Sequence, residues 1–153
     1  MMTRQKRFIL QEDEIPTQWY NIQADMVNKP LPPLNPATKK ALKAEDLYPV
    51  FCEECCRQEF DQEHAWIDIP DEVLDMYKYY RSTPLVRAYA LEKALDTPAH
   101  IYFKNESVNP LGSHKINSAL AQCYYCKQEG TTNVTTAVSY THLRAHETPE
   151  HLV

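Results

Sequence analysis

One lysine of this sequence lies where an amine could act as a nucleophile. Lys115 ends the run Asn-Pro-Leu-Gly-Ser-His-Lys at residues 109–115 and falls in the first turn of a predicted helix. A helix N-terminus carries partial positive charge and unpaired backbone N–H groups, so it disfavours an ammonium ion and attracts an anion such as phosphate. An amine held there is easier to deprotonate, and the neutral amine forms imines with aldehydes. The residues therefore predict a lysine site for pyridoxal 5'-phosphate, which carries both an aldehyde and a phosphate.

The elements around this loop follow a strand–loop–helix–strand pattern. Residues 99–106 are rich in β-formers and predict a strand, whose end residues Asn105 and Glu106 we interpret as structural. Residues 113–129 predict a helix, with Ser113 as its N-cap and Gly130 as the left-handed residue that ends it. Residues 131–138 predict a second strand. One such βαβ unit implies an α/β fold with a parallel sheet.

The chain before this unit predicts helices and one extended segment. Helices are expected over residues 37–60, 71–80 and 88–95, the second beginning after Pro70 and turning Val73, Leu74, Tyr77 and Tyr80 inward. The proline-rich residues 30–36 must be extended, because each proline fixes φ and disfavours helix at its predecessor. Residues 1–29 are polar and irregular, with Trp19 and Tyr20 as expected points of attachment.

The run at residues 109–117 resembles the lysine loop of fold-type-II pyridoxal-phosphate enzymes. Its His-Lys-Ile-Asn form, at residues 114–117, is most similar to the tryptophan synthase beta chain. Further segments in the same order resemble the longer, second type of that beta chain, at residues 15–22, 30–36, 81–85, 91–95, 101–106 and 119–125. The resemblance covers residues 15–136 and corresponds to the N-terminal third of a family member.

The resemblance implies a role for individual residues. Lys115 would form the imine with pyridoxal phosphate, His114 would lie beside the cofactor phosphate, and Asn117 would help to shape the site. Thr83 and Pro84 match a segment on the substrate side. No metal is implied. The implied activity is that of a carbon–oxygen lyase of tryptophan biosynthesis, which makes L-tryptophan from L-serine and indole in the cytoplasm, as a homodimer with an alpha chain as partner.

The sequence departs from the family after Thr136. The family continues into a Glu-Thr-Gly-Ala-Gly-Gln loop, whereas this chain reads Ala-Val-Ser-Tyr at residues 137–140. The acid–base glutamate and the later glycine-rich phosphate loop are missing, and the whole chain has only two glycines. We therefore expect residues 1–136 to be the N-terminal portion of a beta-chain-like domain and residues 137–153 to be a foreign or disordered tail. We expect this chain by itself not to sustain the reaction.

Two other functions fit parts of the sequence. One is a serine or threonine dehydratase-like lyase on the same fold, although His114 and Asn117 favour the synthase type. The other is a small zinc-binding or interaction module, since Cys123, Cys126, His142 and His146 have Cys2His2 spacing. Against zinc, both cysteines fall inside a predicted helix.

Composition and hydropathy argue against binding to nucleic acid and against a membrane span, and the cysteine content favours the cytoplasm. A net charge of −5 with scattered Lys and Arg argues against a nucleic-acid partner. No apolar run approaches the ~18 residues that span a membrane. Five cysteines without a disulfide framework favour a reducing cytoplasm.

Overall fold

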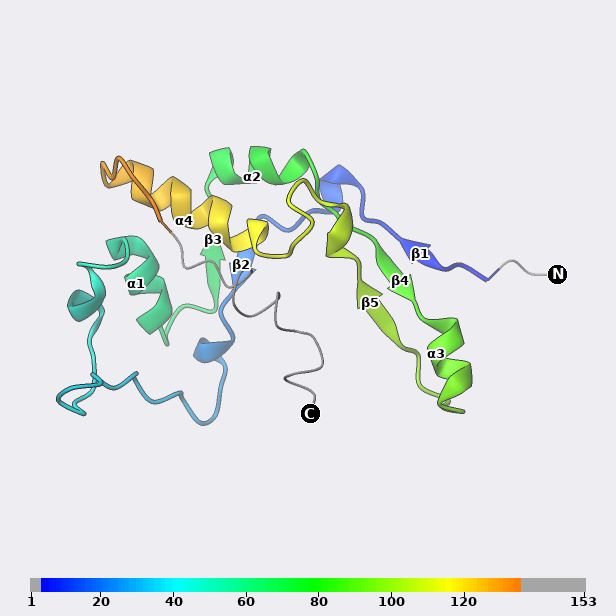
Figure 1. The fold of residues 1–153 in the computed structure, drawn as a ribbon, viewed down its shortest axis with the longest axis horizontal. Helices are drawn as coiled ribbons and strands as arrows, with labels where there is room; N and C mark the ends of the chain where they lie inside the picture. Colours follow the sequence, from blue (N-terminus) through cyan, green and yellow to red (C-terminus); the bar gives the residue numbers. More distant parts are fainter. Residues whose placement is uncertain (1–3, 136–153) are drawn as a thin grey trace, which may run out of the picture.

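The computed structural model describes residues 4–135, which form helices and two small antiparallel sheets (Figure 1). The α-helices are α1 (Glu53–Phe60), α2 (Asp71–Lys78), α3 (Tyr89–Ala94) and α4 (Ile116–Gln128). The strands are β1 (Arg7–Phe8), β2 (Gln18–Tyr20), β3 (Trp66–Asp68), β4 (Leu85–Arg87) and β5 (Tyr102–Lys104). Short 3-10 helices cover Glu12–Glu14, Ile22–Ala24, Ala44–Leu47 and Glu106–Val108.

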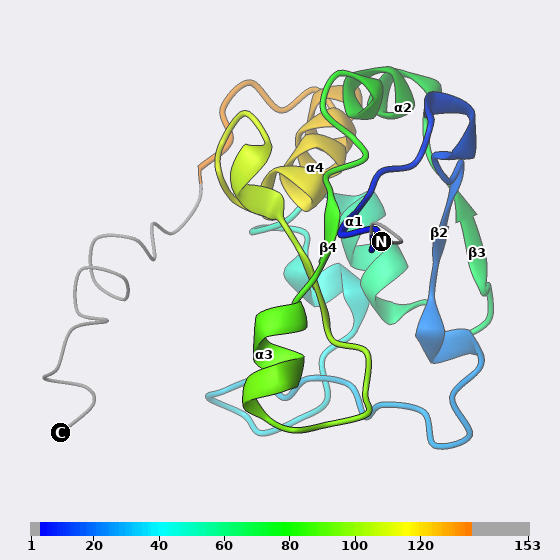
Figure 2. The same cartoon turned by 90° about the vertical axis from the view of Figure 1, so that its right-hand side faces the viewer.

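The two sheets lie in different parts of the molecule. One has the order β1-β4-β5, with Phe8 opposite Leu85 and Val86 opposite Phe103. The other is the pair β2-β3, with Trp19 opposite Ile67. Figures 1 and 2 show α3 at one end of the β4–β5 pair, while α1, α2 and α4 gather around the β2–β3 pair.

The core forms where α2 and α4 pack beside the second sheet. Its buried members are Ile69, Val73, Tyr77 and Ala121, and Tyr77 is only 1% exposed. Half-buried side chains from the neighbouring elements complete this core: Trp19, Leu74, Tyr80, Leu120, Tyr124 and Tyr125. The core therefore fixes the helix that begins directly after Lys115.

The predicted mixture of helices and strands is confirmed, but the parallel sheet is not formed in the described residues. Every strand pairing within residues 4–135 is antiparallel. Residues 131–135, the first part of the predicted second strand, carry no regular structure, and the rest of that strand lies outside the described residues. A parallel pair needs two strands that flank the crossover helix, and here β5 pairs instead with β4, which precedes it.

The helix that follows the lysine is confirmed with a later start. It covers Ile116–Gln128, and Lys115 rather than Ser113 occupies the N-cap position. Gly130 adopts φ +80° directly after the C-cap, as predicted. Its N–H donates to the Lys127 carbonyl and the Thr131 N–H donates to the Cys126 carbonyl, so these two carbonyls of the last turn are satisfied.

The remaining expectations are met to different degrees. α2 begins after Pro70 as predicted, and α3 lies within residues 88–95. Residues 37–60 contain one 3-10 turn and α1 rather than one helix. Residues 30–36 contain no helix and are almost entirely exposed. The predicted tail at residues 137–153 lies outside the described residues.

Candidate functional site

The loop before α4 is organised by one buried asparagine. Asn109 is 6% exposed, and its Oδ1 accepts the N–H groups of Leu111 at 3.0 Å and Ser113 at 3.2 Å. Its Nδ2 donates to the Ser113 carbonyl at 2.9 Å. Gly112 sits inside this turn at φ +61°, a conformation that L side chains rarely adopt. The loop is thus a hydrogen-bonded turn that directly precedes His114 and Lys115.

Glu106 connects this loop to the first sheet and to α4. Its Oε1 accepts the Thr83 hydroxyl at 2.6 Å, and its Oε2 accepts Asn109 Nδ2 at 3.1 Å and Asn117 Nδ2 at 3.5 Å. The Lys104 ammonium lies 4.0 Å from Oε1 and also donates to the Thr83 hydroxyl and carbonyl. Thr83, Lys104, Glu106, Asn109 and Asn117 are called the Glu106 cluster below.

The protonation states in this cluster follow from its contacts. Burial by itself would raise the pKa of Glu106, but hydrogen bonds from Thr83, Asn109 and Asn117 and the charge of Lys104 outweigh burial and lower it. Burial lowers the pKa of Lys104, and the charge of Glu106 opposes that shift. Glu106 therefore stays a carboxylate that accepts hydrogen bonds from three segments.

Asn117 is held by Tyr77 of α2 and by Tyr80 just after that helix, as well as by Glu106. Its Oδ1 accepts the Tyr80 hydroxyl at 2.9 Å, and its backbone carbonyl accepts the Tyr77 hydroxyl. Its side chain is therefore fixed from two sides, and the first turn of α4 is fixed with it.

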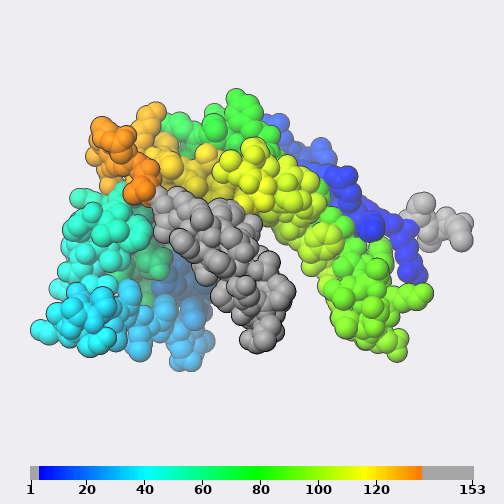
Figure 3. Space-filling model, in the orientation of Figure 1, coloured from blue at the N-terminus to red at the C-terminus, as the bar shows by residue number. Residues whose placement is uncertain are grey.

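His114 and Lys115 lie at the surface, in contrast to the clamped residues around them. Both are exposed, and the surface segment coloured yellow in Figure 3 contains this loop and the start of α4. The Lys115 carbonyl accepts the Ser118 hydroxyl at 3.3 Å and the Ala119 N–H at 3.0 Å. The structure thus brings Thr83 and Asn117 together on Glu106, next to buried Pro84, whereas Lys115 is exposed.

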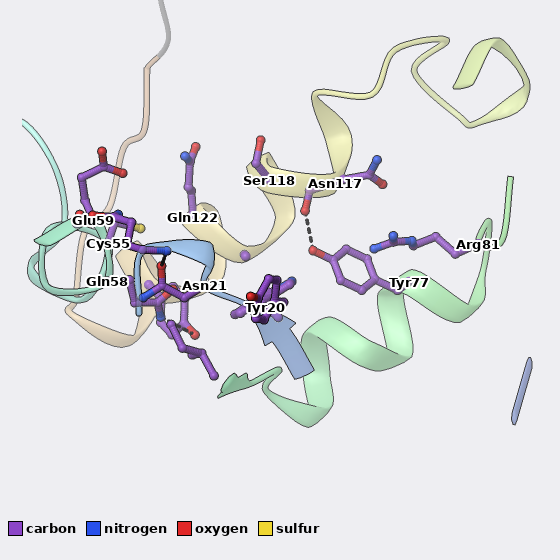
Figure 4. A pocket seen from close by; sticks show the side chains of 15 residues that line it. Tyr20, Asn21, Cys55, Gln58, Glu59, Tyr77, Arg81, Asn117, Ser118 and Gln122 are labelled. Atoms are coloured by element: carbon purple, nitrogen blue, oxygen red, sulfur yellow. Dashed lines mark hydrogen bonds between the residues drawn. The ribbon is translucent and has the colours of Figure 1, made fainter. Parts of the chain in front are cut away.

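A cavity of about 550 Å³ lies on another face of α4. Figure 4 shows Cys55, Gln58 and Glu59 of α1 opposite Ser118 and Gln122 of α4 across this space. Tyr77 and Arg81 close one end, and Tyr77 reaches the Asn117 backbone. Asn117 and Ser118 belong to the lining, whereas His114 and Lys115 do not.

The described residues supply one component of a pyridoxal-phosphate site. Such a site needs an amine, an enclosing pocket and backbone N–H groups for the phosphate. The amine is present at Lys115, but the cavity is not lined by it. The N–H groups of Leu111, Ser113 and Lys115 already bond to the side chains of Asn109 and Ser113. Residues 4–135 therefore do not by themselves hold the cofactor.

The zinc alternative is tested only in part. Within residues 4–135 no group of three or more His, Cys, Asp or Glu side chains is arranged to hold a metal ion. His142 and His146 lie outside that range. In the described part of the chain, no helix has the length and apolar character needed to cross a membrane.

The central role of Glu106 in this site is not predicted by the sequence. From the sequence we interpret Glu106 only as a structural residue at a strand end. Its spacing to Thr83, Asn109 and Asn117 gives no sign that its carboxylate accepts hydrogen bonds from all three. The helical spacing of Tyr77 and Tyr80 predicted packing, not hydrogen bonds to Asn117. Both contacts depend on tertiary structure.

Comparison with known proteins confirms the resemblance stated from the motifs. Residues 76–142 match the family described as pyridoxal-phosphate dependent enzyme. The chain is 48% identical to "Tryptophan synthase beta chain 2" of Methanosarcina mazei over 132 residues, and 50% identical to that of Aquifex aeolicus over the same length. It is 50% identical to "Tryptophan synthase beta chain" of Pyrococcus horikoshii over 129 residues. These alignments cover 84–86% of this chain but only 28–30% of each relative.

Proposed function

We propose that this chain belongs to the family of pyridoxal-phosphate-dependent enzymes and is the N-terminal portion of a tryptophan synthase beta chain of the second type. The observation that carries the proposal is the identity of about one half over 132 residues, within which the lysine loop is clamped at the start of a helix. The family match extends to residue 142, and residues 1–136 are proposed as the beta-chain portion. Residues 137–153 are proposed as an off-family tail.

Lys115 is proposed as the residue that carries the cofactor. The Glu106 cluster supports this role, because it fixes the turn before Lys115 and the helix after it. His114, exposed beside Lys115, is proposed to contact the cofactor phosphate. Asn117 is proposed to help shape the cofactor site, and Thr83 and Pro84 are proposed to lie on the substrate side. The bonds of Asn117 and Thr83 to the Glu106 carboxylate support these roles, because they hold both side chains beside the lysine loop.

The activity proposed for the complete protein is β-replacement, which makes L-tryptophan from L-serine and indole in the cytoplasm. The cofactor supplies the electron sink for such chemistry. A homodimer and an alpha chain are the proposed partners. The 153-residue chain itself is proposed to be inactive, because Lys115 does not line the cavity of the described residues and the family's glutamate loop is absent from the sequence.

Reductive labelling of the 153-residue chain tests the lysine assignment. The chain is incubated with pyridoxal phosphate, reduced with borohydride and mapped by mass spectrometry. Lys127 is the matched control, because it is also exposed but lies at the C-terminal end of the same helix. We expect Lys115 to be labelled about threefold more than Lys127, since a helix N-terminus attracts the phosphate and a C-terminus repels it.

Two outcomes would contradict the proposal. Equal labelling of the two lysines, or preference for Lys127, would remove Lys115 from the cofactor role. Formation of tryptophan by the 153-residue chain with serine, indole and pyridoxal phosphate would show that its inactivity was wrongly proposed.

A further inference from the structure

The cavity between α1 and α4 has the size and the walls of a site for a flat molecule. Its volume of about 550 Å³ lies in the range of about 300–1,000 Å³ that small-molecule sites have. Four aromatic side chains line it: Trp19, Tyr20, Tyr77 and Tyr125. They belong to β2, α2 and α4, so these elements together build the apolar part of the cavity. An aromatic ring packs favourably against such walls.

Arg81 brings a positive charge to one end of this cavity. Its guanidinium carbon lies 4.7 Å from the centre of the Tyr77 ring, and Figure 4 shows the two side chains together at that end. A guanidinium stacked in this way uses its face, while its five N–H donors lie in its plane. Within residues 4–135, none of these donors forms a hydrogen bond or an ion pair with another residue. Arg81 is half-buried, so its donors are partly removed from water and still lack a protein acceptor.

The neighbours of Arg81 hold the guanidinium in place without neutralising it. Tyr77 is only 1% exposed and its hydroxyl donates to the Asn117 backbone carbonyl, so the ring under the guanidinium is fixed. Glu59 is the acidic residue among those that line the cavity, and it lies on α1 at the opposite end (Figure 4). A cation held in this way is prepared for an anionic ligand, because little side-chain freedom is lost on binding.

We propose that this cavity binds a small aromatic carboxylate, whose ring lies among the aromatic side chains and whose carboxylate receives two N–H groups of Arg81. A carboxylate is the anion that fits, since its two oxygens match two parallel N–H groups of one guanidinium. A phosphate group carries more charge and more acceptor oxygens, and Arg81 is the one cationic side chain among the described residues that line the cavity. The site does not depend on the function proposed above, because neither Lys115 nor Glu106 lines it.

A matched pair of ligands tests the proposal on the unaltered 153-residue chain. Cinnamate is the probe, and cinnamamide, which has the same ring and nearly the same shape without the charge, is its control. We expect calorimetric titration to show that cinnamate binds about tenfold more tightly, because only the carboxylate forms charge-assisted hydrogen bonds with Arg81. The chain has a net charge of −5, so unspecific adsorption would favour the neutral amide instead. Nuclear Overhauser effects from the ligand ring to Tyr77 and Tyr125 are expected to locate the bound molecule.

Two arginine variants separate the charge in the cavity from charge elsewhere. Arg81→Gln is expected to weaken cinnamate binding about tenfold and to leave cinnamamide binding unchanged. Arg57→Gln is the matched control, because Arg57 is exposed, pairs with Glu54 and does not line this cavity, so both affinities should stay the same. Equal affinities of the unaltered chain for the two ligands, no binding of cinnamate, or Overhauser effects only to residues outside the cavity would overturn the proposal. The two-ligand comparison needs no variant to fold.

Discussion

Glu106 is the residue that determines the geometry around the lysine. One carboxylate accepts hydrogen bonds from Thr83, Asn109 and Asn117, which belong to the segment before β4, the loop and α4. A charged acceptor with several donors is costly to remove, since each donor is then left without its partner. The position of Lys115 therefore depends on a residue nine positions earlier in the chain.

Replacing Glu106 by glutamine should destabilise the fold. Glutamine presents an NH2 group to donors that need an acceptor, so we expect the free energy of unfolding to fall by about 2 kcal/mol. Urea unfolding at pH 7 measures the change. The control is Glu63→Gln, at an exposed position, which should stay within about 0.5 kcal/mol. Equal effects of the two substitutions would contradict the role given to Glu106.

The stability contributed by Glu106 should depend on pH. Its pKa is lower in the folded chain than the ordinary value, so its contribution is present above about pH 4.3 and is lost as the pH falls through the lowered folded value. The stability difference between the original chain and Glu106→Gln should therefore shrink on acidification. A stability difference that grew at low pH would contradict a lowered pKa of Glu106 in the folded chain.

Asp61 offers a second acid-sensitive group in the loop after α1. Hydrogen bonds from the backbone N–H groups of His64 and Glu63 lower the pKa of Asp61 from 3.8 to about 2. We expect the Asp61 carboxylate to remain ionised at pH 3, as followed by carbon NMR of its side chain. Half-protonation near pH 4 would show that these hydrogen bonds are absent in solution.

Among the helices and strands, the sequence predicts the helices that have strong apolar periodicity, and it does not predict the short strands. α2 and α4 were predicted because their apolar residues recur at helical spacing and because Pro70 and Gly130 mark an end of each. The strands have only two or three residues each, too few for alternation to show. Pairing of β2 with β3 across more than 40 residues leaves no local signal.

The end of α4 provides a test of one such element. Gly130 has φ +80° and open space where a Cβ would lie, so a substitution there changes stability only through the backbone conformation. We expect Gly130→Ala to reduce the free energy of unfolding by about 1 kcal/mol and Gly130→Asn to reduce it less, since asparagine tolerates left-handed backbone. Thermal unfolding compares the two variants. An alanine variant as stable as the parent would exclude a left-handed backbone conformation at residue 130.

The whole molecule exposes more apolar surface than its small core would suggest. Among the described residues, Val27 is 98% exposed, Leu31 91% and Tyr79 84%, while only six hydrophobic residues are buried. The chain spans about 30% of the length of the Methanosarcina and Aquifex relatives. Large apolar groups left in water are typical of surfaces that other parts of a protein or a partner cover.

This exposure predicts how the 153-residue chain behaves in solution. We expect it to bind the dye ANS under native conditions, because dye binding reports accessible apolar surface. Fluorescence titration measures this, with a compact protein of similar size as reference. Absence of dye binding would show that these apolar side chains are covered in solution.

Lys115 is proposed above as the cofactor lysine of a beta-chain portion. The most direct measurement joins residues 1–136 to the remaining sequence of the Methanosarcina mazei relative and adds pyridoxal phosphate. The adduct is then reduced, and the labelled residue is identified by mass spectrometry. We expect the cofactor to be recovered on Lys115, and we expect the Lys115→Ala variant to remain unlabelled. Recovery of the cofactor on any other lysine would contradict this assignment.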